Sequence, residues 1–340
     1  MAIEVWNRAD LDNVRNNLSG DYIQMANIDL SDSNWSPIDW DGSNFFYGSY
    51  NGNGYTISNM TVSGTFTLGL FASTEGTASL RNINLRDVYV SGSSSVGGLV
   101  GSNYGNIYGC SVTGDVRGYL NVGLLAGAND AAGLGVGGLS VERCWTKGSV
   151  ATNDSSITDS RIGGLIGYIA HSDIPVRNCY SGADVTFSEL NGGGLIGRCF
   201  DGAVYHCYSY GIITAVGGSP TSGGGVIGSA SAASTLTNIY YDADRVGYNS
   251  ASSGTPRTTA EMTYPENFTT TYINWDFTNI WTHDPTYTIN DGYPPFGAGF
   301  NIWVKKSGAW QPVTDIWARK GGAWQPVSSV DVNKDGWKPI

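Results

Sequence analysis

The residues most often used in hydrolytic catalysis are few in this sequence and show no catalytic arrangement. The three histidines are His171, His206 and His283. A nucleophilic triad needs a histidine that the fold places beside a serine or cysteine, yet none of the three lies near a sequence typical of a nucleophile elbow. The sequence therefore predicts no triad.

Paired carboxylates are the other candidate catalytic groups. Asp184, Asp242 and Asp244 could serve a glycosidase or a lyase built on a β-rich scaffold. With 29 acidic residues in the chain, however, some carboxylates come close by chance. We therefore assign no catalytic residue, and enzymatic activity stays an open alternative.

One stretch resembles the opening of a calcium-binding loop. Residues 331–336 read Asp-Val-Asn-Lys-Asp-Gly, in which alternating oxygen ligands precede a glycine turn. The closing glutamate of such a loop has no counterpart, and the stretch aligns with residues 305–308 and 319–322. We interpret it as a hairpin turn, and the sequence predicts neither a metal site nor a cofactor site.

Four of the five cysteines recur at one position of a repeated block. They are Cys110, Cys144, Cys179 and Cys207, and the fifth cysteine is Cys199. Equivalent positions of stacked parallel strands lie about 4.8 Å apart, so the four thiols form a line and not the converging ligand set that zinc requires. We expect them to be reduced and to act as small apolar core residues.

A glycine-rich block precedes each cysteine position and organises the chain. Residues 96–101 read Val-Gly-Gly-Leu-Val-Gly, and close copies recur at steps of 26 to 40 residues. Repeats of this kind indicate stacked units that cover one another. Glycine is expected where a neighbouring coil presses close or a corner needs a positive φ. The structural repeat positions are Gly98, Leu99, Gly101, Gly164, Leu165, Gly167, Gly194, Leu195 and Gly197.

The two blocks together, for example residues 162–167 and 176–180, resemble the GLUG-type repeats of bacterial surface proteins. The resemblance extends over about residues 20–297, and it implies an all-β fold, a right-handed parallel β-helix or β-solenoid. Apolar and polar residues alternate within the short blocks, as in half-buried strands. Residues 7–18 instead have apolar residues at helical spacing, with Asn7 as the N-cap.

These patterns divide the chain into four parts. We expect an N-terminal cap at 1–20, whose short helix covers the open end of the first coil. The β-helix follows at 21–241, and a closing cap segment follows at 242–299. The last part, 300–340, is described next.

Residues 300–340 carry a different repeat, in which a strand, a glycine turn, a tryptophan and a proline follow one another. It predicts a small module of β-hairpins. Six basic and three acidic residues give it a formal charge of +3, against −11 for the whole chain. The repeat resembles those at the C-termini of many bacteriophage tail and virion proteins, which implies an attachment role. The candidate attachment residues are Trp303, Trp310, Trp317 and Trp324.

Charge and hydropathy exclude some partners. The net charge of −11 disfavours nucleic acid and anionic membranes, which bind basic patches. No apolar run approaches the roughly 20 residues that span a bilayer, so no membrane insertion is predicted. The N-terminus does not resemble a signal peptide, and we expect synthesis in a cytoplasm without export by this N-terminus.

The sequence as a whole predicts a non-enzymatic bacteriophage virion protein. We expect a tail fibre, spike or tip component that contacts other virion proteins and a host cell-surface glycan, because exposed aromatic rings stack on sugar faces. A homo-trimer is the candidate assembly. Two alternatives stay open: a phage polysaccharide depolymerase on the same β-helix, and a bacterial adhesin at the cell surface.

Overall fold

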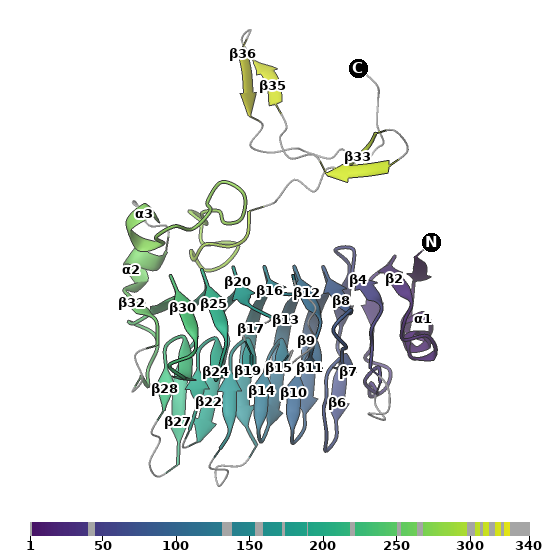
Figure 1. Cartoon of the computed structure of the whole chain (residues 1–340), viewed down its shortest axis with the longest axis horizontal. Coiled ribbons are helices and arrows are strands. Elements are labelled where there is room, and N and C mark those ends of the chain that lie inside the picture. The colour runs from purple at the N-terminus through teal and green to yellow at the C-terminus, as the bar shows by residue number, and fades with distance from the viewer. Residues whose placement is uncertain are drawn as a thin grey trace. The chain divides into compact units, whose positions relative to one another are not determined.

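The computed structural model describes residues 2–39, 45–130, 138–153, 159–171, 174–188, 190–217, 222–249, 253–263 and 268–297, together with four strands of the tail. The chain divides into two compact units, Met1–Pro295 and Phe296–Ile340. The first unit is a parallel β-helix whose coils each add strands to stacked sheets (Figure 1). The fold therefore agrees with the β-helix that the repeats predict.

Two large sheets contain most of the strands, and every pair within them is parallel. The nine-stranded sheet consists of β1 (Ile3–Val5), β2 (Asp21–Gln24), β4 (Ser49–Asn51), β8 (Ser79–Arg81), β12 (Asn106–Tyr108), β16 (Val141–Glu142), β20 (Val176–Arg177), β25 (Ala203–Tyr205) and β30 (Thr235–Thr237). The twelve-stranded sheet consists of β3 (Ile28–Asp29), β5 (Thr56–Ser58), β6 (Thr61–Ser63), β9 (Asn84–Ser91), β13 (Ser111–Gly118), β17 (Trp145–Thr152), β21 (Tyr180–Ser181), β22 (Asp184–Ser188), β26 (Tyr208–Ser209), β27 (Ile213–Val216), β31 (Tyr240–Asp242) and β32 (Thr255–Arg257).

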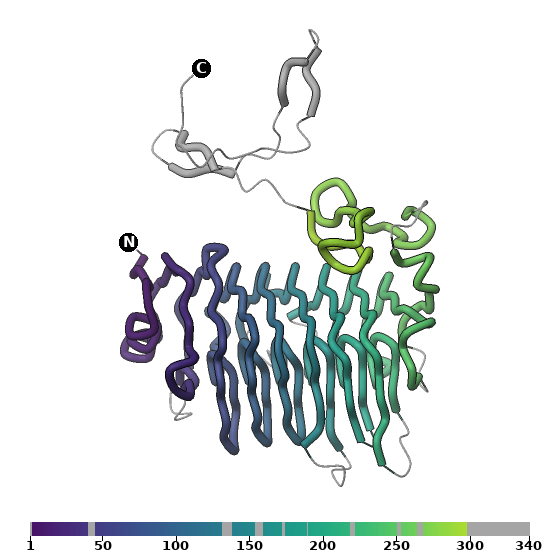
Figure 2. The backbone as a smooth tube through the Cα atoms, turned by 180° about the vertical axis from the view of Figure 1, so that it is seen from behind, coloured from purple at the N-terminus to yellow at the C-terminus, as the bar shows by residue number. Residues whose placement is uncertain are grey.

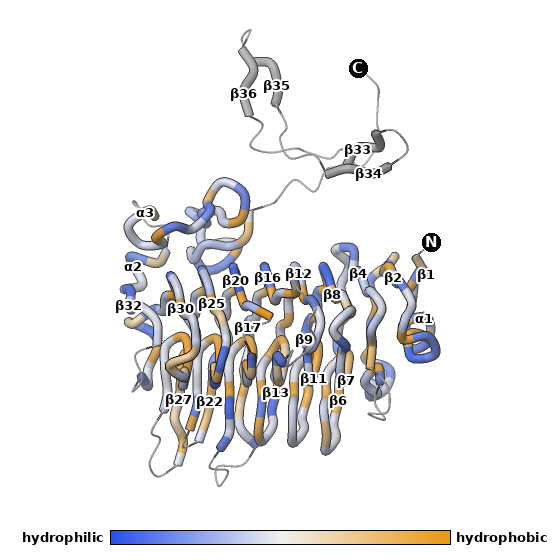
Figure 3. The backbone as a smooth tube through the Cα atoms, viewed as in Figure 1, coloured by the Kyte–Doolittle hydropathy of each residue, from blue (hydrophilic) through white to orange (hydrophobic). Residues whose placement is uncertain are grey.

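Two smaller parallel sheets contain the glycine-rich blocks. The six-stranded sheet consists of β7 (Phe71–Ser73), β11 (Val100–Asn103), β15 (Ala126–Asn129), β19 (Ile166–Ile169), β24 (Ile196–Cys199) and β29 (Ile227–Ala230). The five-stranded sheet consists of β10 (Ser95–Gly97), β14 (Asn121–Gly123), β18 (Arg161–Gly163), β23 (Gly192–Gly193) and β28 (Gly223–Gly224). Figure 3 shows apolar stretches recurring from one coil to the next, and their side chains fill a continuous core.

The repeated glycines allow successive coils to approach closely. A Cβ atom on Gly164 would lie 2.1 Å from the carbonyl oxygen of Gly194, and one on Gly194 would lie 2.2 Å from that of Gly225. Neither Gly164, Gly194 nor Gly98 has a positive φ. Of the two reasons that the sequence offers for glycine, the close approach of a neighbouring coil therefore applies at these positions, and a positive φ does not. Leu99, Leu165 and Leu195, which follow these glycines, are fully buried.

Two other glycines bend the long strands of the twelve-stranded sheet. Gly114 and Gly148 have φ angles of 141° and 139°, which are strained for a residue with a side chain. The register between β9 and β13 shifts at this point, between Val112 and Gly114. The bend divides the sheet into a first half, with β5, β21, β26 and β31, and a second half, with β6, β22 and β27.

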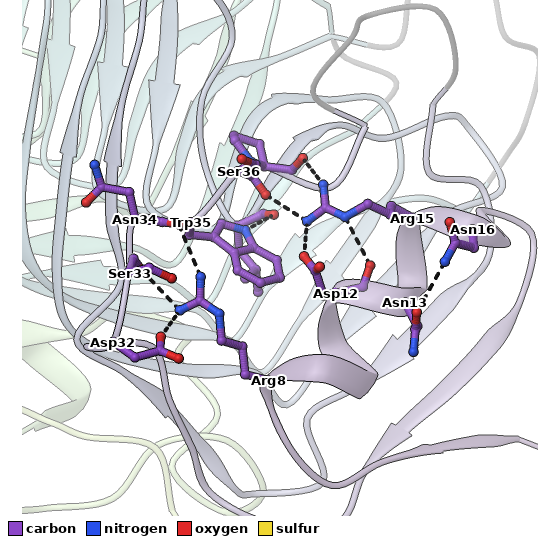
Figure 4. A network of polar contacts seen from close by, with 12 residues as sticks. Arg8, Asp12, Asn13, Arg15, Asn16, Asp32, Ser33, Asn34, Trp35 and Ser36 are labelled. Atoms are coloured by element: carbon purple, nitrogen blue, oxygen red, sulfur yellow. Dashed lines mark hydrogen bonds and ion pairs between the residues drawn. The ribbon is translucent and has the colours of Figure 1, made fainter.

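The N-terminal cap contains the predicted helix. Helix α1 (Arg8–Asp12) continues as a 3-10 turn (Asn13–Asn16), and the side chain of Asn7 accepts a hydrogen bond from the backbone N–H of Asp10. Arg8 and Arg15 lie on either side of Trp35 and donate to backbone carbonyls of residues 30–37 (Figure 4). Trp35 is buried, so this loop and helix together close the first coils.

The closing segment, which we define as residues 258–295, follows the last coil and also contacts earlier coils. After β32 it contains α2 (Thr259–Met262) and α3 (Phe268–Thr271) and then passes back along earlier coils. Asp291 pairs with Lys147 at 2.6 Å, and Arg143 donates to the carbonyl of Asn279 at 3.4 Å. Figure 2 shows this light-green segment against the C-terminal coils of the β-helix.

The described part of the tail contains two antiparallel hairpins, as the tail repeat predicts. One pairs β33 (Trp303–Lys306) with β34 (Ala309–Pro312), and the other pairs β35 (Trp317–Lys320) with β36 (Ala323–Pro326). The third copy of the repeat, including the calcium-like stretch 331–336, lies outside the described residues.

Candidate ligand-binding face

A ladder of aromatic side chains lies on the first half of the twelve-stranded sheet. Trp145, Tyr180, Tyr208 and Tyr240 occupy equivalent positions of four successive coils. The ring centroids of Trp145 and Tyr180 are 5.8 Å apart, and those of Tyr180 and Tyr208 are 5.0 Å apart, with nearly parallel planes in both pairs. Such offset stacks stabilise beyond the area they bury.

The closing segment covers most of this ladder. The hydroxyl of Tyr208 donates to the carbonyl of Pro294 at 2.7 Å and accepts from Nδ2 of Asn290 at 2.7 Å. Tyr210 on the same coil donates to Oδ1 of Asn290 at 2.7 Å. Burial raises the pKa of Tyr208 well above its usual value. The rings of the closing segment and of the ladder bury one another, so this cluster is not available for stacking on a sugar.

The second half of the same sheet carries an uncovered outer surface, which we call the outer track. It comprises two rows of outward-facing positions in register: Thr61, Tyr89, Asp115, Ser149 and Asp184 form one row, and Ser63, Ser91, Arg117, Ala151, Thr186 and Thr214 form the other. The residues between the rows, for example Val90 and Val116, are buried. The track is therefore a sheet surface of mostly small polar side chains, with Tyr89 and Arg117 as its large members.

Exposed aromatic rings lie on and beside the outer track. Tyr89 within the track is 43% exposed, while Phe66 and Tyr119, in the turns at its edge, are 73% and 37% exposed. Exposed tyrosines present a large apolar face together with a hydrogen-bonding hydroxyl. This is the chemistry that a sugar ring requires of its binding surface.

An ion pair fixes the polar centre of the track. Nε and Nη2 of Arg117 donate to the two carboxylate oxygens of Asp115 at 2.8 and 2.9 Å. Ser149 of the next coil donates to the same carboxylate at 2.9 Å. The hydrogen bonds from Arg117 and then Ser149 lower the pKa of Asp115, and the carboxylate raises the pKa of Arg117. The pair therefore stays ionised and oriented at neutral pH.

The candidate carboxylates of the sequence do not form a catalytic pair in the structure. Oδ2 of Asp242 accepts from the hydroxyls of Thr259 and Tyr293, and Oδ1 accepts from the backbone N–H of Asp244. Asp184 lies on a different strand, in the outer track, and accepts from a backbone N–H of the following coil at 2.9 Å. Asp242 and Asp244 thus hold the start of the closing segment.

The three histidines lie in separate places. Nε2 of His171 is 3.8 Å from a carboxylate oxygen of Asp130. His206 lies under the closing segment beside Trp275, and His283 lies between two phenylalanine rings of that segment. Burial lowers the pKa of both His206 and His283, which favours their neutral forms.

The cysteine column lies in the core. The thiols of Cys110, Cys144, Cys179 and Cys207 are fully buried, as is that of Cys199, and all five are free. Each column thiol faces the carbonyl two residues before it, at 3.1 to 3.5 Å. Burial raises the pKa of Cys110, Cys144 and Cys179 well above the usual value, which makes these thiols unreactive.

The described residues also bear on metal binding and on membrane insertion. Within these residues, no cluster of three or more His, Cys, Asp or Glu side chains could hold a metal ion. Nor does any helix of the described ranges have the length and apolar character needed to cross a membrane. The candidate attachment residues Trp303, Trp310, Trp317 and Trp324 lie on the hairpin strands, with Trp303 opposite Pro312 and Trp317 opposite Pro326.

The outer track has a sequence signal of its own, separate from the glycine-rich and cysteine blocks. Successive coils place two outward residues on either side of an apolar residue, as in Tyr89-Val90-Ser91, Asp115-Val116-Arg117 and Ser149-Val150-Ala151. This alternation marks the outward positions. It does not distinguish them from the outward positions of the aromatic ladder, which the closing segment covers.

Comparison with known proteins identifies the repeat. Residues 92–117 match the family described as the GLUG motif. The chain is 30% identical to a protein of Evansella cellulosilytica described as a Gly-rich membrane protein, over 86% of this chain and 44% of that protein. It is also 34% identical to halomucin of Haloquadratum walsbyi, over 38% of this chain and 2% of halomucin. The chain thus spans less than half the length of these relatives.

Two solved structures share the fold. A crystal structure from Bacteroides ovatus, described as an immunoglobulin A1 protease, has a TM-score of 0.68 at 18% identity, over 87% of this chain and 92% of that chain. Another, described as an IgA1 protease, has a TM-score of 0.54 at 18% identity, over 74% of this chain and 21% of that chain. At this identity the likeness concerns the fold alone. The chain therefore carries a GLUG motif within a parallel β-helix, as its repeated blocks predict.

Proposed function

We propose that this chain is a non-enzymatic, glycan-binding β-helix of a cell-surface protein. The observation that carries the proposal is the outer track, where exposed Tyr89 lies beside the oriented Asp115–Arg117 pair on a flat, uncovered face. Aromatic rings and fixed hydrogen-bonding groups are the usual elements of a ligand site. The relative described as a Gly-rich membrane protein supports the cell surface as the location.

The experiment is a binding assay of the purified full chain on a glycan array. Tyr89→Ala should reduce binding by about tenfold, the value of one stacked aromatic contact. Tyr47→Ala is the matched control, since Tyr47 is 49% exposed and lies outside the track. Absence of glycan binding, or equal effects of the two variants, would overturn the proposal.

A depolymerase on the same scaffold predicts a different result. The purified chain would then release shorter fragments from a polysaccharide, and Asp184→Asn, which alters the one carboxylate of the track outside the ion pair, would lower that release. The carboxylate of Asp242 already accepts hydrogen bonds from the hydroxyls of Thr259 and Tyr293. This supports binding without turnover.

The tail supports a second candidate, a bacteriophage virion protein that binds a host-surface glycan. Its two hairpins have the strand–turn–Trp–Pro order of the tail repeat, and the proposed attachment role belongs to residues 300–340. Neighbouring genes distinguish the candidates, because tail genes favour the virion and secretion genes favour the cell surface. Within a virion, deletion of residues 300–340 should prevent incorporation into particles while the β-helix still folds.

A further inference from the structure

We propose that the outer track binds an uncharged, linear polysaccharide that lies along the axis of the β-helix, across successive coils. This inference rests on the proposed glycan binding and deepens it. It assigns the ligand class and the direction in which the ligand crosses the sheet.

The register of the track gives the direction. Thr61 pairs with Tyr89, Tyr89 with Asp115, Asp115 with Ser149, and Ser149 with Asp184. Adjacent parallel strands lie about 4.8 Å apart, so a polymer along the axis meets one polar side chain from each coil. A polymer parallel to a strand would instead leave the track after two outward positions, because the bend lies on one side and the turns lie on the other.

The side chains of the track give the hydrogen-bonding chemistry. Ser63, Ser91, Thr186 and Thr214 contribute hydroxyl groups that can donate and accept, while the hydroxyl of Ser149, which donates to Asp115, can still accept. Sugar hydroxyls also donate and accept, so a row of such groups matches a chain of sugar units. Tyr89 is 43% exposed, so its ring is accessible to a ligand on this surface.

The charge of the track excludes polyanions. Arg117 is the one cation of the two rows, and the carboxylate of Asp115 neutralises it through two hydrogen bonds. Asp184 adds a negative charge, and the chain as a whole carries −11. A polyanion would therefore meet no free cation on the track and would be repelled by the body, whereas an uncharged polysaccharide would not.

The closing segment leaves this surface open. It covers the first half of the sheet, at Tyr208 and Tyr210, while Tyr89 in the second half stays exposed. The uncovered rows extend from β6 to β27, which is five strand spacings or roughly 24 Å.

The test uses the purified full chain in affinity electrophoresis with matched polymers. Neutral linear polysaccharides, namely hydroxyethyl cellulose, mannan and pullulan, are compared with carboxymethylated forms of the same backbones. We expect retardation by at least one neutral polymer and at least about tenfold weaker binding of its carboxymethylated form. Binding of the carboxymethylated form that is equal or tighter would overturn the uncharged-ligand assignment.

Two variants test the direction. Tyr89→Ala and Thr186→Gln alter positions of the track that lie three coils apart, and the second extends a longer neutral side chain across the path. Both should weaken binding about tenfold, with Tyr47→Ala and unchanged circular dichroism as controls. A loss in Tyr89→Ala alone would overturn the axial direction and leave glycan binding intact. No retardation by any glycan, neutral or charged, would instead overturn the proposed function itself.

Discussion

Removing one hydroxyl, with Tyr208→Phe, should release the closing segment without unfolding the β-helix. The change keeps the stacked ring but leaves the carbonyl of Pro294 and Nδ2 of Asn290 without the partner that each has at 2.7 Å. Each buried group left without a hydrogen bond costs about 1–3 kcal/mol. At the lower part of this range the two groups together cost about 2–4 kcal/mol, and the loss falls on the docking of residues 258–295.

Hydrogen exchange by mass spectrometry measures this effect segment by segment. A loss of 2–4 kcal/mol corresponds to roughly 30- to 900-fold faster exchange of backbone amides in residues 284–293, while amides of β13 and β17 should not change. Tyr205→Phe is the matched control, because Tyr205 lies on the same coil and its hydroxyl has no hydrogen bond within the described residues. Exchange in residues 284–293 that stays within threefold of the original would refute the reasoning.

Three further predictions follow from the core and the closing segment. Gly164→Val should lower the free energy of unfolding by about 3 kcal/mol or more, because even its Cβ would lie 2.1 Å from the carbonyl oxygen of Gly194; an unchanged denaturation midpoint would contradict this. Ellman's reagent should modify none of the five cysteines quickly in the native protein and all five in denaturant, since all are free and buried; fast native modification would contradict it. Burial alone would raise the pKa of Asp284, but four backbone N–H groups of residues 288–292 lower it. Ionised Asp284 therefore stabilises the closing segment at a pH above its pKa in the unfolded chain, near 4. This stabilisation is lost as the pH falls through the lowered pKa of the folded chain. Tryptophan fluorescence measured against pH should show the release of the closing segment at acid pH in the original protein and not in the Asp284→Asn variant. A transition that persists in the variant would refute the assignment.

Local rules predict much of the β-helix from the sequence. The spacing of the glycine-rich and cysteine blocks predicts stacked coils, and Asn7 predicts the start of the capping helix. These features depend on interactions between neighbouring residues or between identical positions of successive coils, so the repeat itself contains the information. The tail repeat likewise predicts its hairpins, because a strand, a glycine turn and a second strand pair locally.

The reason for the glycines needed the tertiary structure. At Gly164 the limiting contact is a carbonyl of the next coil, whereas Gly114 and Gly148 bend a strand with a positive φ. One sequence shows only that glycine recurs. It cannot distinguish a close neighbour from a left-handed backbone, because both exclude a side chain.

The exposed surface was decided by the tertiary structure alone. Tyr89 and Tyr208 both occupy outward positions of alternating strands, so the sequence treats them alike. In the folded chain Tyr208 is fully buried under residues 258–295, and Tyr89 is exposed. The period of two fixes which face of a sheet a side chain occupies, but whether solvent or protein covers that face is decided by residues as far as 86 positions away in the sequence.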